Sequence, residues 1–140
     1  MKKILFLFSF FLSVSTTFSQ SDSTDMKLQK IAAEKDDNIR IDLIVDLFLS
    51  TYDSNPVLDM QNAQKLLLQS QKTKDKITEA MALTEIGYDY RSFNIPKSME
   101  YNLKATSLAQ ETGNEKLIGY PKINLAHNYK DLADYPKAIS

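Results

Sequence analysis

One pattern of residues occurs twice in this chain of 140 residues, as LTEIGYDYRSFNIPKSMEYNLKA at 83–105 and as KINLAHNYKDLADYPKAI at 122–139. The corresponding positions are related by one constant offset, which pairs Ile86 with Leu125, Gly87 with Ala126, and Tyr90 with Tyr129. In each copy an apolar residue and a small residue precede a tyrosine, a turn and a second helical segment. The recurrence predicts a helix hairpin that is repeated along the chain.

The residues that begin or end the predicted helices recur at nearly the same interval as this pattern. Pro56, Pro96 and Pro136 are evenly spaced, and proline is favoured in the first turn of a helix. Gly113 is suited to the left-handed conformation that ends a helix. The predicted helices span 39–53, 56–71, 75–92, 96–112, 116–132 and 136 onward. Short turns between them imply that neighbouring helices run antiparallel.

We therefore expect an all-α fold of antiparallel helix-hairpin repeats that stack as an α-solenoid, because each pair can bury its apolar faces only against the next. The expected repeats are 38–73, 74–113 and 114–140, the last of them incomplete. Before them come a signal peptide at 1–19 and a leader with a short helix at 20–37.

The two stretches resemble the tetratricopeptide repeat. In the later stretch the signature positions are filled by Leu125, Ala126, Tyr129, Tyr135 and Ala138. In the earlier stretch they are filled by Ile86, Gly87, Tyr90 and Ala105, with Ser98 where alanine is usual. The hairpin at 39–71 departs most from the pattern, with Phe48 at the small position and Thr51 at the tyrosine position, as in a divergent N-terminal repeat.

The resemblance implies a module that binds a protein or peptide along a concave surface formed by the first helix of each hairpin. The positions carried over are Tyr88, Arg91 and Ser92 in one repeat and His127, Lys130 and Asp131 in the next. In register, Tyr88 aligns with His127 and Arg91 with Lys130, which predicts an aromatic row beside a basic row. Such a surface could bind an extended peptide or a terminal carboxylate; the alternative is that these are ordinary exposed polar residues.

The N-terminus has the layout of a secretory signal peptide. Lys2 and Lys3 precede an apolar run from Ile4 to Val14, and small residues follow before Gln20. The run is too short to cross a bilayer, which needs about 20 residues. We expect an exported protein, periplasmic or secreted after crossing the inner membrane, and a mildly acidic mature chain.

The last predicted helix has only begun at Ser140, so we expect an N-terminal fragment of a longer protein. The signal peptide and the repeats together resemble the exported N-terminal regions of bacterial two-component sensor proteins, such as sensor histidine kinases. Any membrane contact would then come from a transmembrane helix beyond Ser140. The alternative is a free-standing secreted helical-repeat protein that associates with itself.

Composition and motifs favour binding over catalysis. The formal net charge is −1 without a clustered basic surface, which argues against nucleic acid as a partner. The chain has no cysteine and one histidine, and no zinc, phosphate-loop or catalytic-triad pattern. His127 and Asp131 share a helix face at a spacing that could hold a metal, but a surface histidine is the simpler interpretation. We also interpret Glu85 and Asp89, at i and i+4, as a solvated face, and we expect no metal, cofactor or catalytic residue.

Overall fold

The computed structural model describes residues 23–133 and residue 137, and within them every regular element is an α-helix. The all-α prediction is confirmed for this part of the chain. The chain divides into two compact units, 1–34 and 35–140. The described part of the first unit is a helix at 23–33, which lies within the segment 20–37 predicted to hold a leader and a short helix. The predicted signal peptide lies outside the described residues.

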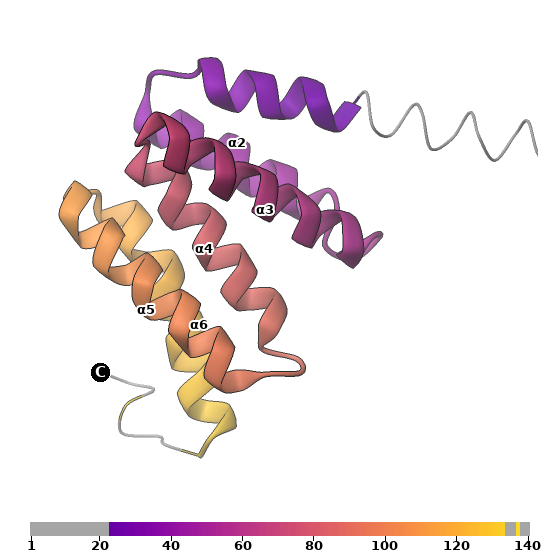
Figure 1. The fold of residues 1–140 in the computed structure, drawn as a ribbon. Helices are drawn as coiled ribbons and strands as arrows, with labels where there is room; N and C mark the ends of the chain where they lie inside the picture. The colour runs from indigo at the N-terminus through magenta and orange to yellow at the C-terminus, as the bar shows by residue number, and fades with distance from the viewer. Residues whose placement is uncertain (1–22, 134–136, 138–140) are drawn as a thin grey trace, which may run out of the picture. The chain divides into compact units, whose positions relative to one another are not determined.

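The second unit contains five helices in the described residues (Figure 1). Their bounds are α2 Asp37–Leu49, α3 Pro56–Thr73, α4 Lys76–Tyr90, α5 Ile95–Thr112 and α6 Glu115–Asp131. These bounds agree with the predicted ranges to within a few residues. The largest difference is that α2 ends at Leu49, where the Ser50 hydroxyl donates to the Leu47 carbonyl and the chain turns.

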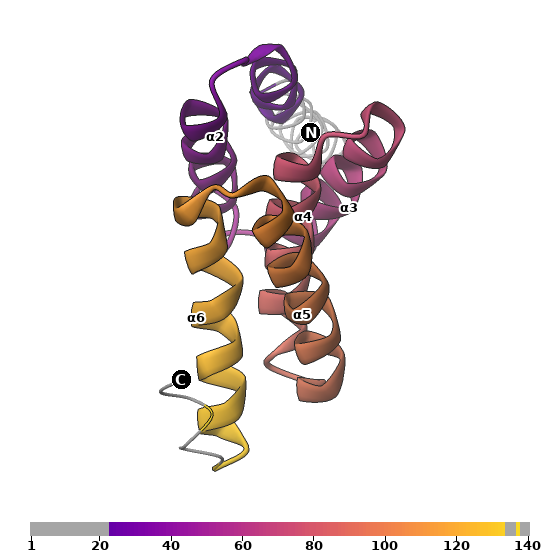
Figure 2. The same cartoon turned by 90° about the vertical axis from the view of Figure 1, so that its left-hand side faces the viewer.

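Consecutive helices from α3 to α6 pack against each other, and α4 also contacts both α2 and α6. Figure 2 shows α2 and α6 on one side of α4, with α3 and α5 on the other. The second unit therefore has a row of α2, α4 and α6 beside a row of α3 and α5. None of the described helices is long and apolar enough to span a membrane.

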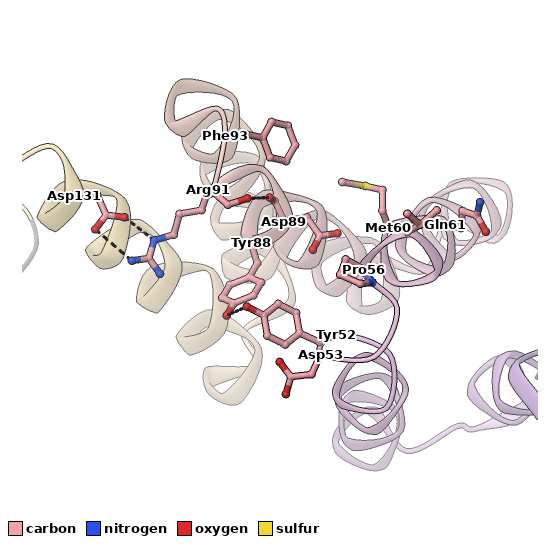
Figure 3. A pocket seen from close by; sticks show the side chains of 12 residues that line it. Tyr52, Asp53, Pro56, Met60, Gln61, Tyr88, Asp89, Arg91, Phe93 and Asp131 are labelled. Atoms are coloured by element: carbon pink, nitrogen blue, oxygen red, sulfur yellow. Dashed lines mark hydrogen bonds and ion pairs between the residues drawn. The ribbon is translucent and has the colours of Figure 1, made fainter.

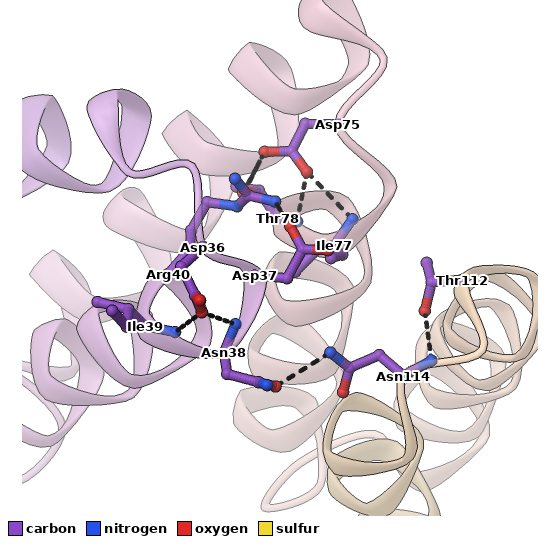
Figure 4. A network of polar contacts seen from close by, with 10 residues as sticks. All are labelled: Asp36, Asp37, Asn38, Ile39, Arg40, Asp75, Ile77, Thr78, Thr112 and Asn114. Atoms are coloured by element: carbon purple, nitrogen blue, oxygen red, sulfur yellow. Dashed lines mark hydrogen bonds and ion pairs between the residues drawn. The ribbon is translucent and has the colours of Figure 1, made fainter.

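The helices of the first row begin with the same kind of cap, at the offset that relates the two sequence copies. Asp36, Asp75 and Asn114 are the N-caps of α2, α4 and α6, and each side chain accepts hydrogen bonds from backbone N–H groups in the first turn. The three caps lie at one end of the row (Figure 4), where Asn114 donates to the Asn38 side chain at 3.1 Å. Arg40 of α2 approaches Asp75 at 3.5 Å.

The helices of the second row are capped alike as well. Asn55 and Asn94 adopt nearly the same backbone conformation, and each accepts a hydrogen bond from the N–H three residues later. Proline occupies the first turn of both α3 and α5, as predicted. At the other end of these two helices, Lys74 and Gly113 are both left-handed, with φ of 59° and 69°. The caps of both rows thus recur at the same constant offset.

Gly87 explains why α4 and α5 pack closely. A Cβ atom at this position would lie 2.5 Å from the Asn102 amide nitrogen on α5. In the preceding repeat the equivalent residue is Phe48, a buried ring, and α2 makes few direct contacts with α3. The bulky residue at the small position therefore leaves the first hairpin more open than the second.

The other predicted repeat positions are distributed between the core and its edge. Ile86 and Leu125 are buried, and so is Leu47, the equivalent residue of the first repeat. The Tyr90 ring stacks on Tyr101 of α5, with centroids 5.5 Å apart. On α6 the half-buried repeat positions are Ala126 and Tyr129, whereas the positions that lie outside the described residues are Tyr135, Pro136 and Ala138.

Candidate functional site

The six residues predicted to line the concave surface lie near the C-terminal ends of α4 and α6. Four of them, Tyr88, Arg91, Ser92 and Asp131, line a cleft of about 820 Å³. The cleft is also lined by Tyr52, from the turn after α2, and by Met60, from the start of α3 (Figure 3). The other two predicted residues, His127 and Lys130, are half-buried and exposed respectively, and do not line the cleft.

Arg91 is engaged with Asp131. The guanidinium donates from Nε to Asp131 Oδ2 at 2.7 Å and from a terminal nitrogen to Oδ1 at 3.3 Å. This pairing raises the pKa of Arg91 and lowers that of Asp131. The predicted basic row of Arg91 and Lys130 is therefore corrected: the charge of Arg91 is balanced by Asp131, which lies next to Lys130 in the sequence and reaches across from α6.

Tyr52 and Tyr88 form a pair at the centre of the site. Their hydroxyls are 3.0 Å apart, and their rings meet edge to face with centroids 5.1 Å apart. The hydrogen bond to Tyr52 raises the pKa of Tyr88 to about 12, and burial adds to this effect. Tyr52 is absent from the predicted site residues, because it lies within the least regular of the predicted repeats.

A second hollow, the groove, lies along the helices of the first row. It has a volume of about 210 Å³ and shares Tyr52 and Tyr88 with the cleft. The other groove residues used below are Leu49, Glu85, Tyr120, Ile123 and Asn124. Two of these side chains are apolar yet open to solvent, with Leu49 73% and Ile123 57% exposed. The tyrosine pair therefore stands between two adjoining hollows.

Three carboxylates gather at the junction of α3 and α4, and we call them the acidic cluster: Asp59, Glu85 and Asp89. One oxygen from each lies within 4.8 Å of the others. Asp59 is fully buried and accepts a hydrogen bond from the Thr51 hydroxyl. Glu85 and Asp89 are half-buried, so the prediction that they form a solvated face is wrong. The reason is that α3 covers this face of α4 and adds a third acid.

Burial determines the protonation of the acidic cluster. It is the main cause that raises the pKa of Glu85 to about 9 and that of Asp89 to about 7, with the nearby charge of Asp59 adding to both. Burial also raises the pKa of Asp59, against the hydrogen bonds from Thr51 and Glu85. At neutral pH Glu85 therefore holds a proton in the absence of another cation.

The next repeat has uncharged polar side chains at the positions equivalent to the acidic cluster. In the register that aligns Ile86 with Leu125, the acids Asp59, Glu85 and Asp89 correspond in turn to Ser98, Asn124 and Asn128. With Asn102 these three residues form what we call the amide cluster, and its members are buried. Asn128 donates to the Ser98 hydroxyl at 2.9 Å, and Ser98 donates to the Gly87 carbonyl at 2.5 Å.

Asn124 connects the amide cluster to both neighbouring helices. Its amide donates to Asn102 on α5 and to the Thr84 carbonyl on α4, each at 3.2 Å. Asn102 in turn donates to the Ser98 carbonyl at 2.9 Å. Buried amides and hydroxyls satisfied in this way contribute to stability and fix the register of the helices.

His127 takes no part in a ligand set within the described residues, where the acidic cluster is the group whose oxygens converge. Asp131, its predicted partner at i+4, is paired with Arg91 instead. Comparison of the chain with protein-family models, with curated proteins and with solved structures finds no match. The site is therefore interpreted from its own geometry.

Proposed function

We propose that the second unit is an interaction module that holds an extended apolar peptide segment of a partner protein in the groove and the adjoining cleft. The observation that carries this proposal is the line of solvent-open apolar and aromatic side chains along α2, α4 and α6. Leu49 and Ile123 are more than half exposed while both line the groove. Apolar residues gathered in an exposed hollow are typical of a binding surface.

The shape of the two hollows favours a peptide as the occupant. The groove, at about 210 Å³, is smaller than pockets for drug-sized ligands and suits one large side chain. The cleft lies on the other side of Tyr52 and Tyr88, so a chain that crosses the tyrosine pair would place one side chain in each hollow. Alternate side chains of an extended strand point the same way, which fits this arrangement.

Electrostatics set the expected character of the peptide. The Arg91–Asp131 pair at the rim of the cleft presents both charges, so it can orient polar groups of a backbone without demanding a terminal carboxylate. We therefore expect recognition by apolar side chains, with backbone hydrogen bonds at the rim.

The wider setting of the module is part of the same proposal. The regular recurrence of the helix caps and the tetratricopeptide resemblance support a stacked helical-repeat protein that works by binding rather than by catalysis. The N-terminal pattern supports export, and the combination supports a place in the exported sensory or scaffold region of a signalling protein.

The test is selection from a display library of random short peptides with the purified chain. We expect selected peptides to carry two large apolar residues separated by a short spacer. Their binding should be lost in Leu49→Lys and in Ile123→Lys, which place a charge in the groove at exposed positions. Leu68→Lys and Leu103→Lys are matched controls, because Leu68 and Leu103 are also exposed but lie on α3 and α5 outside both hollows.

Equal binding by the groove variants and the controls would contradict the proposal, as would a selection without any enriched apolar pattern. Light scattering of the chain alone provides a further check. A dimer that dissociates in Leu49→Lys and Ile123→Lys, but not in the controls, would assign the groove to a second copy of the chain instead.

A further inference from the structure

The acidic cluster has fewer hydrogen-bond donors than its three buried or half-buried carboxylates can accept. Asp59 is fully buried, and its Oδ2 has no hydrogen-bond donor among the described residues; the same holds for Oδ2 of Asp89. Oxygens from Asp59, Glu85 and Asp89 converge within 4.8 Å. Buried carboxylate oxygens without a partner are costly, so the cluster must either hold a proton, as Glu85 does in the absence of metal, or bind a cation.

The amide cluster shows what the same positions look like when they are complete without a ligand. Asn124 and Asn128 bring N–H groups that the carboxylates of Glu85 and Asp89 cannot offer. All the polar side-chain atoms of Ser98, Asn124 and Asn128 that are buried find partners within the described residues. The difference between the two clusters is therefore a set of missing donors in the acidic one.

We propose that Asp59, Glu85 and Asp89 bind a hard divalent cation, Ca²⁺ or Mg²⁺, that joins α3 to α4. Both ions prefer oxygen ligands, and carboxylates are the strongest of these in proteins. Opposite ligands of one such ion lie about 4 to 5 Å apart, roughly twice the metal–oxygen distance, which matches the spread of the three oxygens.

The surroundings provide the remaining ligands. The Thr51 hydroxyl already contacts Asp59. Glu85 lines the groove and Asp89 lines the cleft, so water can reach the ion from either hollow. Zn²⁺ would be a poorer fit, because it favours nitrogen and sulfur ligands, and the chain has no cysteine and a single histidine that lies outside the cluster.

The experiment is a calorimetric titration of the purified full chain, freed of metal with a chelator and dialysed. CaCl₂, MgCl₂ and ZnCl₂ are titrated separately. We expect saturable binding of one Ca²⁺ or Mg²⁺ per chain, and a rise in the melting temperature with the same ion. Whichever of the two binds more tightly identifies the preferred cation.

The decisive variant is Glu85→Gln/Asp89→Asn, which should lower the affinity at least about tenfold because two of three anionic ligands are lost. The matched control is Glu100→Gln/Glu111→Gln, which removes two carboxylates that are more than half exposed and should bind like the wild type. Circular dichroism verifies that both variants are folded.

The proposal is overturned if the folded wild type shows no saturable binding at millimolar Ca²⁺ and Mg²⁺. It is also overturned if Glu85→Gln/Asp89→Asn and the control lose affinity equally, since that would indicate general attraction to an acidic chain. The first criterion uses the wild type alone, so it still tests the proposal if the variant fails to fold. Neither result depends on peptide binding, which the groove variants test separately.

Discussion

The acidic cluster and the amide cluster occupy equivalent positions in successive repeats, yet only the amide cluster is complete from its own side chains. Asn128 donates to Ser98 at 2.9 Å, whereas the equivalent pair, Asp89 and Asp59, are two acids that repel each other. Gly87 lets α5 come close enough to close the amide network, while Phe48 stands at that position one repeat earlier. The same helical register can therefore carry a complete polar network in one repeat and, in the repeat before it, an acidic cluster that we propose as a cation site.

The largest effect should follow when the amide cluster is made acidic. Asn128→Asp removes the donor to Ser98 and places a carboxylate in a fully buried site. We expect the free energy of unfolding at pH 8 to fall by about 3 kcal/mol, measured by urea denaturation. Asn38→Asp, at an exposed position, is the control; a comparable loss there would argue against a role of burial.

Glycine substitutions test the close approach that completes the amide cluster. In Gly87→Ala the new methyl group collides with Asn102, and overpacking should outweigh the gain in helix propensity, giving a net loss of about 1 kcal/mol. Gly119→Ala, where a Cβ atom meets nothing within 4 Å, should gain up to about 1 kcal/mol. Equal changes in the two melting temperatures would contradict the packing described for Gly87.

The acidic cluster should make the metal-free protein less stable as the pH rises. The pKa of Glu85 is raised from 4.5 to about 9 and that of Asp89 from 3.8 to about 7, so the folded state binds more protons than the unfolded state in this window. The groups that face them are Asp59 from α3 and Tyr88 on α4.

The measurement is the melting temperature in chelator from pH 5 to pH 9. We expect a fall of several degrees, equivalent to about 1 kcal/mol, and a flatter profile in Glu85→Gln/Asp89→Asn. A wild-type melting temperature that rises over this range would have the wrong sign for raised carboxylate pKa values.

The smallest effect should come from the ion pair at the rim of the cleft. The side chains of Arg91 and Asp131 are 28% and 33% exposed, so water and salt screen the pair. A double-mutant cycle with Arg91→Ala and Asp131→Ala should give a coupling near the limit of detection that decreases at high salt. A coupling several times larger would mean that the pair fixes α4 to α6.

Local signals make most of the fold predictable. Asn55, Asn94 and Gly113 are capping residues whose roles depend on their own backbone, and the prolines mark the first turns of α3 and α5. These features need no knowledge of distant contacts, so the predicted helix bounds agree closely with those observed. The predicted end of α2 lies too late because the Ser50 hydroxyl donates back to the helix, which a periodicity argument does not anticipate.

The candidate site is harder to predict because its members come together only through packing. Glu85 and Asp89 have the spacing of a solvated helix face, and only the arrival of Asp59 from α3 changes their environment. Arg91 forms an ion pair with Asp131 of the next repeat, so its charge is not available for a basic row with Lys130. The repeat register does contain a usable signal, since Glu85 and Asp89 align with Asn124 and Asn128, whose side chains are typical of buried polar positions.

The most direct test gives the three acidic positions their counterparts from the amide cluster, as Asp59→Ser/Glu85→Asn/Asp89→Asn, and leaves unchanged Ala63, the counterpart of Asn102. If the clusters are equivalent positions of one repeat and differ in missing donors, the variant should fold, melt at a higher temperature than the metal-free wild type at pH 8, and show no change in melting temperature with Ca²⁺ or Mg²⁺. A variant that unfolds, or one that still responds to the ions as the wild type does, would contradict that equivalence.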